Sequence, residues 1–242
     1  MPDSGDQKVT TLAACNFDQH TTLQRLISGL QENRNPMPSI YDLKPGFQRL
    51  LRPITRGLAS KGVTANQVTL SAMLLSVAVG ACLAILPQNH LVQILVPAAL
   101  FVRMALNAID GMLAREHNMK SRLGAVLNEI GDVISDAALY LPVALMEGIH
   151  PVLVVTFVIL AIVSEMTGVV SIQIGGSRRY DGPMGKSDRA VVMGLLCLLA
   201  AGGVTLKPWC NWLLGSVSGL LLVTIWNRAS RALKEAASHD EH

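Results

Sequence analysis

The chain has 242 residues, of which 50% are hydrophobic and only 15% charged, with a mean hydropathy of +0.40 and a formal net charge of +3. A soluble domain of this size has about a quarter of its residues charged, so the composition favours a membrane protein. Aromatic residues are too few (4%) for a base-stacking nucleic-acid surface, and four dispersed cysteines without a CxxC pair argue against a disulfide framework or a zinc site.

The N-terminal part of the chain divides into two segments of different character. Residues 1–38 are polar and mixed, with no apolar stretch of the kind found in a signal peptide, and we expect a polar extension there. Residues 39–62 carry apolar side chains at three- and four-residue steps with basic residues between them. This pattern predicts an amphipathic juxtamembrane helix at the cytoplasmic interface, which Pro45 and Pro53 should kink or split in two.

Six apolar stretches follow, and most approach the length of about 20 residues that a membrane-spanning helix needs. They are Val68–Leu86, Leu91–Ala108, Val133–Met146, Pro151–Ile174, Ala190–Leu206 and Trp212–Trp226. The third is short, and we expect its helix to begin earlier, near Gly124. The fold class predicted is an all-α membrane protein with six transmembrane helices over residues 63–230 and a polar tail at 231–242; a buried all-α soluble core is the alternative.

Basic residues predict how the spans are oriented. Of 20 Lys and Arg residues, 18 precede the first span, follow the sixth, or lie in the loops after spans two and four. Only Lys207 lies in a loop on the other side, and Arg103 falls within the second span. Because basic loops are retained in the cytoplasm, both termini should be cytoplasmic, and the even number of spans is supported.

Two stripes of polar and small residues occupy the end of the second span and the start of the third. The first stripe consists of Asn107, Asp110, Gly111 and Ala114; the second consists of Gly124, Asn128, Asp132 and Asp136. Residues three and four apart share a helix face, and the segment between the stripes should return the chain so that they face each other. Oxygen ligands on facing helices suit Mg²⁺ or Mn²⁺ together with substrate phosphates. Polar packing between helices is the alternative, although carboxylates at membrane depth are unfavourable unless they are functional.

The segment resembles the signature of the CDP-alcohol phosphotransferases, D-x2-D-G-x2-A-R-x8-G-x3-D-x3-D. Every gap matches, and six of the eight defined positions are identical. Residues 65–69, Ala-Asn-Gln-Val-Thr, also resemble the Pro-Asn-x-x-Thr-like start of the family's first span. The resemblance implies a juxtamembrane helix, six transmembrane helices and a homodimer.

The resemblance also implies a reaction. Members of this family displace CMP from a CDP-linked lipid or alcohol with a second alcohol, and four aspartates hold two divalent ions. Carried over by position, Asp110 and Asp132 would bind metal, and Asp132 would be the general base. Gly111, Ala114, Arg115 and Gly124 would bind the nucleotide.

Two positions depart from the pattern, because Asn107 and Asn128 stand where the family has aspartate. An asparagine oxygen can bind a hard cation but supplies no charge, so we expect weaker metal affinity or the loss of one of the two sites. Asp136 continues the second stripe as a possible extra ligand. Arg103 either supplies positive charge to the diphosphate or pairs with Glu165 or Asp136.

A second basic cluster precedes the fifth span. It comprises Arg178, Arg179, Lys186 and Arg189, and it either contacts substrate phosphate or only follows the positive-inside bias. The sequence thus predicts a metal-dependent transferase of the bacterial inner membrane, which uses CDP-diacylglycerol or a related CDP-lipid and a small alcohol and binds no nucleic acid. The alternative is a relative that binds CDP-lipid or lipid headgroups without turnover.

Overall fold

The computed structural model describes residues 40–240, and for residues 40–45 and 239–240 it describes the backbone only. The expected N-terminal extension, residues 1–38, lies outside the described residues. Residues 48–240 belong to one compact unit; residues 40–47 belong to a separate unit and are helical.

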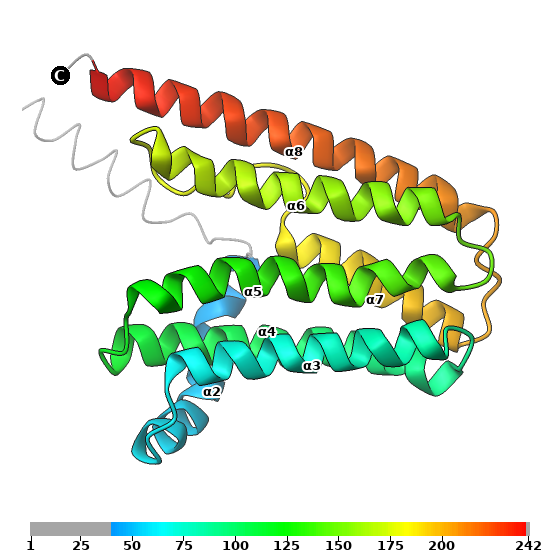
Figure 1. Ribbon diagram of the computed structural model, residues 1–242, viewed down its shortest axis with the longest axis horizontal. Helices are drawn as coiled ribbons and strands as arrows, with labels where there is room; N and C mark the ends of the chain where they lie inside the picture. Colours follow the sequence, from blue (N-terminus) through cyan, green and yellow to red (C-terminus); the bar gives the residue numbers. More distant parts are fainter. Residues whose placement is uncertain (1–39, 241–242) are drawn as a thin grey trace, which may run out of the picture. The chain divides into compact units, whose positions relative to one another are not determined.

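All regular elements of the described residues are helices (Figure 1). Their bounds are α2 Ile40–Ser60, α3 Ala65–Ile85, α4 His90–Glu116, α5 Arg122–Tyr140, the short 3-10 helix η1 Leu141–Leu145, α6 Pro151–Gln173, α7 Lys186–Ala201 and α8 Trp209–Asp240. The all-α class is therefore confirmed.

Polar side chains fix where three of these helices begin. Thr64 and Gln67 form a capping box at α3, in which each side chain accepts a hydrogen bond from the other residue's backbone N–H, at 3.3 and 2.9 Å. Asn89 caps α4, and Ser121 caps α5 by accepting from the Gly124 N–H at 2.9 Å. Such caps satisfy backbone N–H groups that have no partner within the helix. The short polar segments between the apolar stretches therefore determine where these helices begin.

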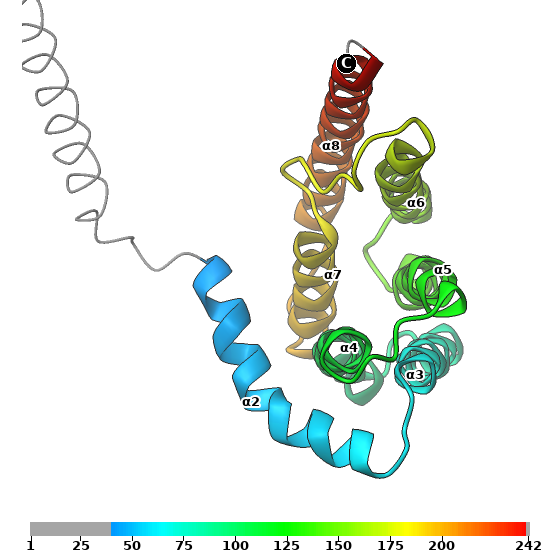
Figure 2. The ribbon, with the colours of Figure 1, turned by 90° about the vertical axis from the view of Figure 1, so that its left-hand side faces the viewer.

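The helices α3 to α8 run side by side along one direction, as Figures 1 and 2 show. The helix α3 packs against both α4 and α5, α7 packs against α4, and α8 packs against α6. Gly80 permits the contact between α3 and α5, because a Cβ atom at this position would lie 2.0 Å from the Ala138 carbonyl oxygen. The backbones of these helices thus approach each other more closely than any side chain would allow.

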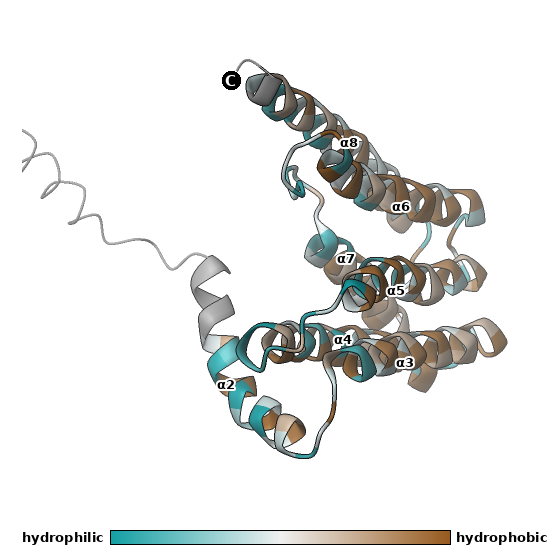
Figure 3. Cartoon of the chain, turned by 60° about the vertical axis from the view of Figure 1, so that its left-hand side comes forward, coloured by the Kyte–Doolittle hydropathy of each residue, from teal (hydrophilic) through white to brown (hydrophobic). Residues whose placement is uncertain are grey.

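Four of the described helices are long and apolar enough to cross a membrane: α3, α4, α6 and residues 209–238 of α8. Their outer surfaces carry many exposed apolar side chains. In Figure 3 much of the length of these helices is coloured as hydrophobic. The helices α5 and α7, with 19 and 16 residues, correspond to the third and fifth expected spans but do not meet the same criteria.

Several boundaries differ from the expected ones. The helix α5 does begin near Gly124, at Arg122, as predicted. The helix α7 ends at Ala201 and not near Leu206, because Gly202 and Gly203 follow, the latter in the left-handed region (φ 78°) that glycine tolerates.

The two ends of the membrane domain also differ from the predicted ones. The helix α8 continues past Trp226 to Asp240, so residues 231–240 of the predicted polar tail are helical.

The amphipathic segment is a single helix, α2, from Ile40 to Ser60. The prediction that its prolines could split it in two is therefore wrong. The second half of α2 is tied to α4 by an ion pair between Arg52 and Glu116 at 2.9 Å.

Candidate functional site

The two predicted polar stripes lie on α4 and α5, which run in opposite directions and both pack against α3. Asn118 adopts a positive φ of 55° in the connection between them, a conformation that asparagine tolerates better than most residues. The chain therefore reverses within a few residues. The Asn107 side-chain amide donates to Asp132 Oδ1 at 3.0 Å, which confirms that the stripes face each other.

Asp110 lies on the same face of α4, one helical turn beyond Asn107. It is buried, and its Oδ2 accepts a hydrogen bond from the Thr69 hydroxyl of α3 at 2.8 Å. Thr69 also donates to the Ala65 carbonyl of its own helix at 3.1 Å. Thr69 was not among the predicted site residues, although it is the last residue of the stretch 65–69 that resembles the start of the family's first span.

Asp132 is the most heavily contacted carboxylate of the site. Its Oδ1 atom accepts from Asn107, lies 3.2 Å from Arg103 Nη2, and forms an ion pair with the Lys186 ammonium group. Lys186 is the first residue of α7, so a third helix contributes to this oxygen. The side chains of Lys186 and Asp132 retain 34% and 18% exposure, and both are therefore accessible to a ligand from water.

Arg103 is buried on α4, one turn before Asn107. It forms an ion pair with Asp136, and its Nη2 donates to the Asp132 carbonyl oxygen at 2.9 Å. Of the two predicted pairings, the one with Asp136 is confirmed. The one with Glu165 is wrong, because Glu165 accepts from arginines of α7 and of the loop before it.

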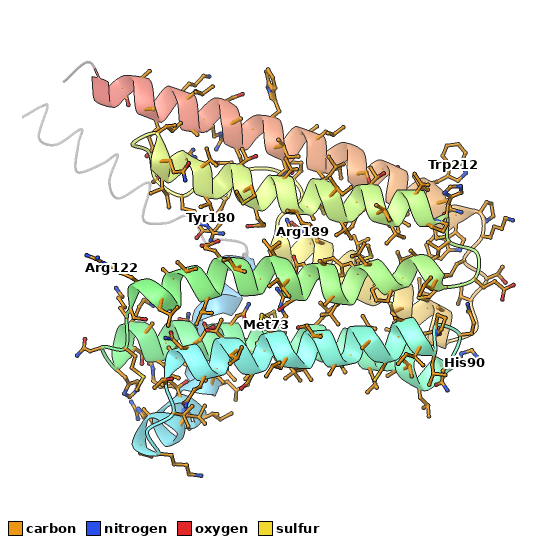
Figure 4. All side chains as sticks on the ribbon, viewed as in Figure 1. Met73, His90, Arg122, Tyr180, Arg189 and Trp212 are labelled. Atoms are coloured by element: carbon orange, nitrogen blue, oxygen red, sulfur yellow. The ribbon has the colours of Figure 1, made fainter. Side chains whose placement is uncertain are left out.

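A buried ion network continues from Asp136 into the bundle. Arg189 of α7 donates to Asp136 Oδ2 at 3.2 Å and to Glu165 Oε1 at 2.8 Å, and its side chain is fully buried. Figure 4 places Arg189 among the helices, away from both ends. Its Nε and Nη1 groups are buried without a hydrogen-bond partner among the described residues. The charge of Arg189 is met by the carboxylates of Asp136 and Glu165.

Arg178 approaches the same network from the loop between α6 and α7. Its Nη2 donates to Glu129 at 2.7 Å and to Glu165 at 3.2 Å, and its Nη1 donates to the Tyr180 hydroxyl at 2.7 Å. Figure 4 shows Tyr180 in the half of the bundle toward Arg122, between Arg122 and Arg189 and far from His90 and Trp212. Arg178 therefore joins Lys186 and Arg189 near the polar stripes.

Arg179 belongs to a different cluster. It contacts Asp181 at 2.8 Å and Glu235 of α8 at 3.1 Å, and Asp181 also pairs with Arg231. Burial would raise the pKa of the Asp181 carboxyl, but the hydrogen bonds and charges of Arg231 and Arg179 hold this pKa below its usual value. These pairs attach the loop to α8. The structure thus separates Arg179 from the other three basic residues of the predicted phosphate cluster.

The small residues of the signature let polar side chains lie close to the backbones of α4 and α5. A Cβ atom at Gly124 would lie 2.7 Å from Asn66 Oδ1 of α3, and one at Gly111 would lie 3.2 Å from Arg115 Nη2. Ala114 and Asn128 are half-buried and Arg115 is exposed. The nucleotide-binding roles implied for Gly111, Ala114, Arg115 and Gly124 remain predictions.

The donor set is of the kind that binds a hard divalent cation. Asp110 and Asp132 supply carboxylate oxygens, and the side-chain amides of Asn107 and Asn128 can add neutral oxygens, which are the ligands that Mg²⁺ and Mn²⁺ prefer. Within residues 40–240, no group of three or more His, Cys, Asp or Glu side chains is arranged to hold a metal. Two carboxylates and two neutral amide oxygens could hold a divalent cation.

Over residues 40–240 the fold is helical, with four helices long and apolar enough to cross a membrane and a charged, oxygen-rich site between helices, as in a helical membrane protein. A sequence model of the CDP-alcohol phosphatidyltransferase family matches residues 62–226. The chain belongs to this family.

Individual relatives agree with this assignment. The inner membrane protein YnbA of Escherichia coli K12 is 46% identical over 199 residues, which cover 82% of this chain and 98% of that protein. The phosphatidylinositol phosphate synthase of Mycobacterium tuberculosis H37Rv is 27% identical over 175 residues, covering 70% of this chain and 76% of the synthase.

Solved structures agree in fold. The crystal structure of the Mycobacterium tuberculosis phosphatidylinositol phosphate synthase with manganese and citrate superposes with a TM-score of 0.61 at 20% identity, covering 75% of this chain and 88% of that one. Its structure with CDP-DAG bound gives a TM-score of 0.59 at 21% identity, over 78% and 94% of the two chains.

Proposed function

We propose that this protein transfers a phosphatidyl group, or a similarly substituted phosphate, from a CDP-linked lipid such as CDP-diacylglycerol to a small alcohol, and releases CMP. The observation that carries the proposal is that Asp132 of α5 bonds to Asn107 of the facing helix, which also carries Asp110, and pairs with the cationic side chains of Arg103 and Lys186. Relatives named phosphatidylinositol phosphate synthases, and a solved relative with bound CDP-DAG, support it.

In such a transfer each residue of the site has a distinct chemical role. A hydroxyl oxygen of the acceptor attacks the lipid-bearing phosphorus of the diphosphate, and the bond from this phosphorus to the bridging oxygen breaks, so that CMP leaves with the electron pair. Asp132 accepts the proton of the attacking hydroxyl. A divalent cation, when bound by Asp110 and Asp132 with Asn107 and Asn128, would neutralise negative charge that develops on the leaving group.

Neighbouring residues hold these groups in place. Thr69 fixes the orientation of Asp110, and Arg103 bonds both the side chain and the carbonyl of Asp132. Arg103 is itself held by Asp136, which makes Asp136 a positioning residue in this scheme and not a metal ligand. Preorganised charges of this kind stabilise a transition state without having to rearrange during the reaction.

The partly exposed guanidinium group of Arg178 supports an acceptor that carries an anionic group, such as a polyol phosphate. Arg178 is bonded to Glu165, as the buried Arg189 is. Guanidinium groups bind phosphate oxygens in a bidentate manner, so Arg178 is suited to bind a phosphate-bearing acceptor. Acceptors that carry a phosphate, such as glycerol phosphate and inositol phosphate, are therefore favoured over serine and uncharged polyols.

Purified protein supplied with CDP-diacylglycerol, Mn²⁺ or Mg²⁺ and a panel of acceptors tests the proposed function directly. We expect CMP release that needs both a divalent cation and a phosphate-bearing acceptor, and that stops when EDTA removes the cation. Binding of CDP-diacylglycerol without CMP release, with every acceptor and either cation, would instead support a relative that binds CDP-lipid or lipid headgroups without turnover.

Replacement of Arg178 by methionine tests the acceptor site. Loss of a charge-assisted hydrogen bond weakens binding by about 1.5–3 kcal/mol, so we expect the KM for the acceptor to rise about 10- to 100-fold while the KM for CDP-diacylglycerol changes little. Arg231→Met is the matched control, because Arg231 pairs with Asp181 in the outer cluster. Equal changes in both KM values, or none, would contradict an acceptor site at Arg178.

The membrane arrangement that we propose has six spans within residues 63–230, formed by α3 to α8, with α5 extended by η1. Residues 39–62 form the juxtamembrane segment at the cytoplasmic surface of a bacterial inner membrane, with residues 1–38 and 231–242 as polar ends on the same side. The distribution of basic residues supports this orientation. A fluorescent protein fused after residue 242 should fluoresce, whereas a periplasmic reporter inserted at Lys207 should be active; the reverse pattern would contradict it.

The family resemblance further supports a homodimer. Exposed apolar side chains along α3 and α4, such as Leu74, Ile94 and Phe101, provide surface for either lipid or a second copy. Crosslinking in membranes, followed by mass measurement, distinguishes a dimer from a monomer.

A further inference from the structure

The Lys186 ammonium group lies on the oxygen-rich face of the site, where it forms an ion pair with Asp132 Oδ1. The same oxygen accepts from the Asn107 amide at 3.0 Å and from Arg103 at 3.2 Å. Three donors therefore already surround one oxygen of a residue that a divalent cation would also use.

The position of Lys186 is set by the local fold. It opens α7, whose N-terminus is held by a hydrogen bond from the Gly185 N–H to Asp188 Oδ2 at 2.9 Å, and α7 packs against α4. The packing of α7 against α4 therefore places the Lys186 ammonium group beside Asp132. Its side chain is one-third exposed, so the group can also meet a substrate phosphate.

The charges of the site do not accommodate two divalent ions. At the four signature positions the chain carries two carboxylates, Asp110 and Asp132, and two neutral amides. One divalent cation balances those two negative charges, and Lys186 adds a further positive charge on the same carboxylate. In two-metal sites the ions lie only about 3.5–4 Å apart, so a second ion would be repelled by the first and by the ammonium group.

We infer that the site binds one divalent cation per chain, and that the Lys186 ammonium supplies the second positive charge to the diphosphate. Asn107 and Asn128 fit this arrangement because the two carboxylates that remain, Asp110 and Asp132, are already balanced by one divalent cation. Arg103 does not take this role, since Asp136 already neutralises it. The inference rests on the proposed function, because it assigns Lys186 to the CDP-lipid.

The number of bound Mn²⁺ ions tests the inference without relying on turnover. Equilibrium dialysis of the purified full-length protein in detergent, with Mn²⁺ alone as the probe and metal analysis as the readout, should give one ion per chain. The variant Asn107→Asp/Asn128→Asp/Lys186→Met adds two negative charges and removes one positive charge, and it should bind two ions. Two ions in the unchanged protein, or one in the variant when it elutes as a folded protein, would overturn the inference.

Activity separates this inference from the proposed function. Removal of a single preorganised donor at a reacting centre lowers the rate about 10²- to 10³-fold, so Lys186→Met should lower CMP release about 100-fold at saturating Mn²⁺ while still binding one ion. Lys186→Arg should retain most activity, and Lys207→Met, at the opposite end of the bundle, is the matched control. Full activity of Lys186→Met would overturn the role of Lys186 and leave the proposed function intact. Absence of CMP release from the unchanged protein would instead overturn the proposed function.

Discussion

Asp132→Asn is expected to lower CMP release by at least about 10³-fold, because the substitution removes both the proton acceptor and one of the two carboxylates that would hold the cation. A positioned general base alone contributes about 10²- to 10⁴-fold. The substitution keeps the size of the side chain, and its amide can still bond to Asn107. CMP release from CDP-diacylglycerol, measured at saturating Mn²⁺, gives the result directly.

The matched control is Glu147→Gln, which makes the same carboxylate-to-amide change at an exposed position after η1, at the opposite end of the bundle. It should leave CMP release unchanged. The account would be contradicted if Asp132→Asn retained more than a tenth of the activity, or if both variants lost activity equally. Thermal unfolding of the two variants shows whether a loss of activity reflects a loss of fold.

Gly80→Ala is expected to destabilise the bundle more than any other alanine substitution of its helical glycines. The added Cβ atom would lie 2.0 Å from the Ala138 carbonyl oxygen, which is a backbone atom and cannot rotate away. The helices α3 and α5 must separate to accommodate it. Overpacking of this kind lowers the free energy of unfolding by about 1–3 kcal/mol, and sometimes more. The melting temperature in detergent should fall accordingly.

Gly215→Ala provides the control for that measurement. Gly215 is also helical, but a Cβ atom there meets nothing within 4 Å. Alanine is a better helix former than glycine by about 1 kcal/mol, so this variant should be neutral or slightly more stable. Equal melting temperatures for Gly80→Ala and the unchanged protein would show that α3 and α5 are not held as closely as described.

The core of the site could be predicted because it depends on local periodicity. Four-residue steps place Gly124, Asn128 and Asp132 on one face of a helix wherever that helix lies, and a short polar connection forces the chain to return. The contact between Asn107 and Asp132 follows from those two facts. The pairing of Arg103 with Asp136 was one of two candidates, and only the packing of the helices decided between them.

The contacts of α3 and α7 with the site could not be predicted. Thr69 reaches Asp110 and Lys186 reaches Asp132 across large separations in sequence, and no periodicity reports which helices become neighbours. The division of the basic cluster has the same cause: Arg178 and Arg179 are adjacent in sequence, yet one bonds to α5 and α6 and the other to α8.

Helix ends are set by caps and breakers that an apolar count does not use. Thr64 and Ser121 cap the starts of α3 and α5, and Gly202 follows the end of α7, before the expected end near Leu206. Hydropathy placed the end of α8 too early, at Trp226. The helix continues to Asp240 through polar residues, which a count of apolar residues does not include.

The most direct test of the central claim is the position of the cation in a structure of this protein crystallised with Mn²⁺ and CDP-diacylglycerol. Anomalous scattering from manganese identifies the ion without ambiguity. We predict one anomalous peak, bound by oxygens of Asp110 and Asp132 and by the diphosphate, with the Lys186 ammonium on the diphosphate. A peak away from these two carboxylates, or none when the CDP-lipid is bound, would contradict the account.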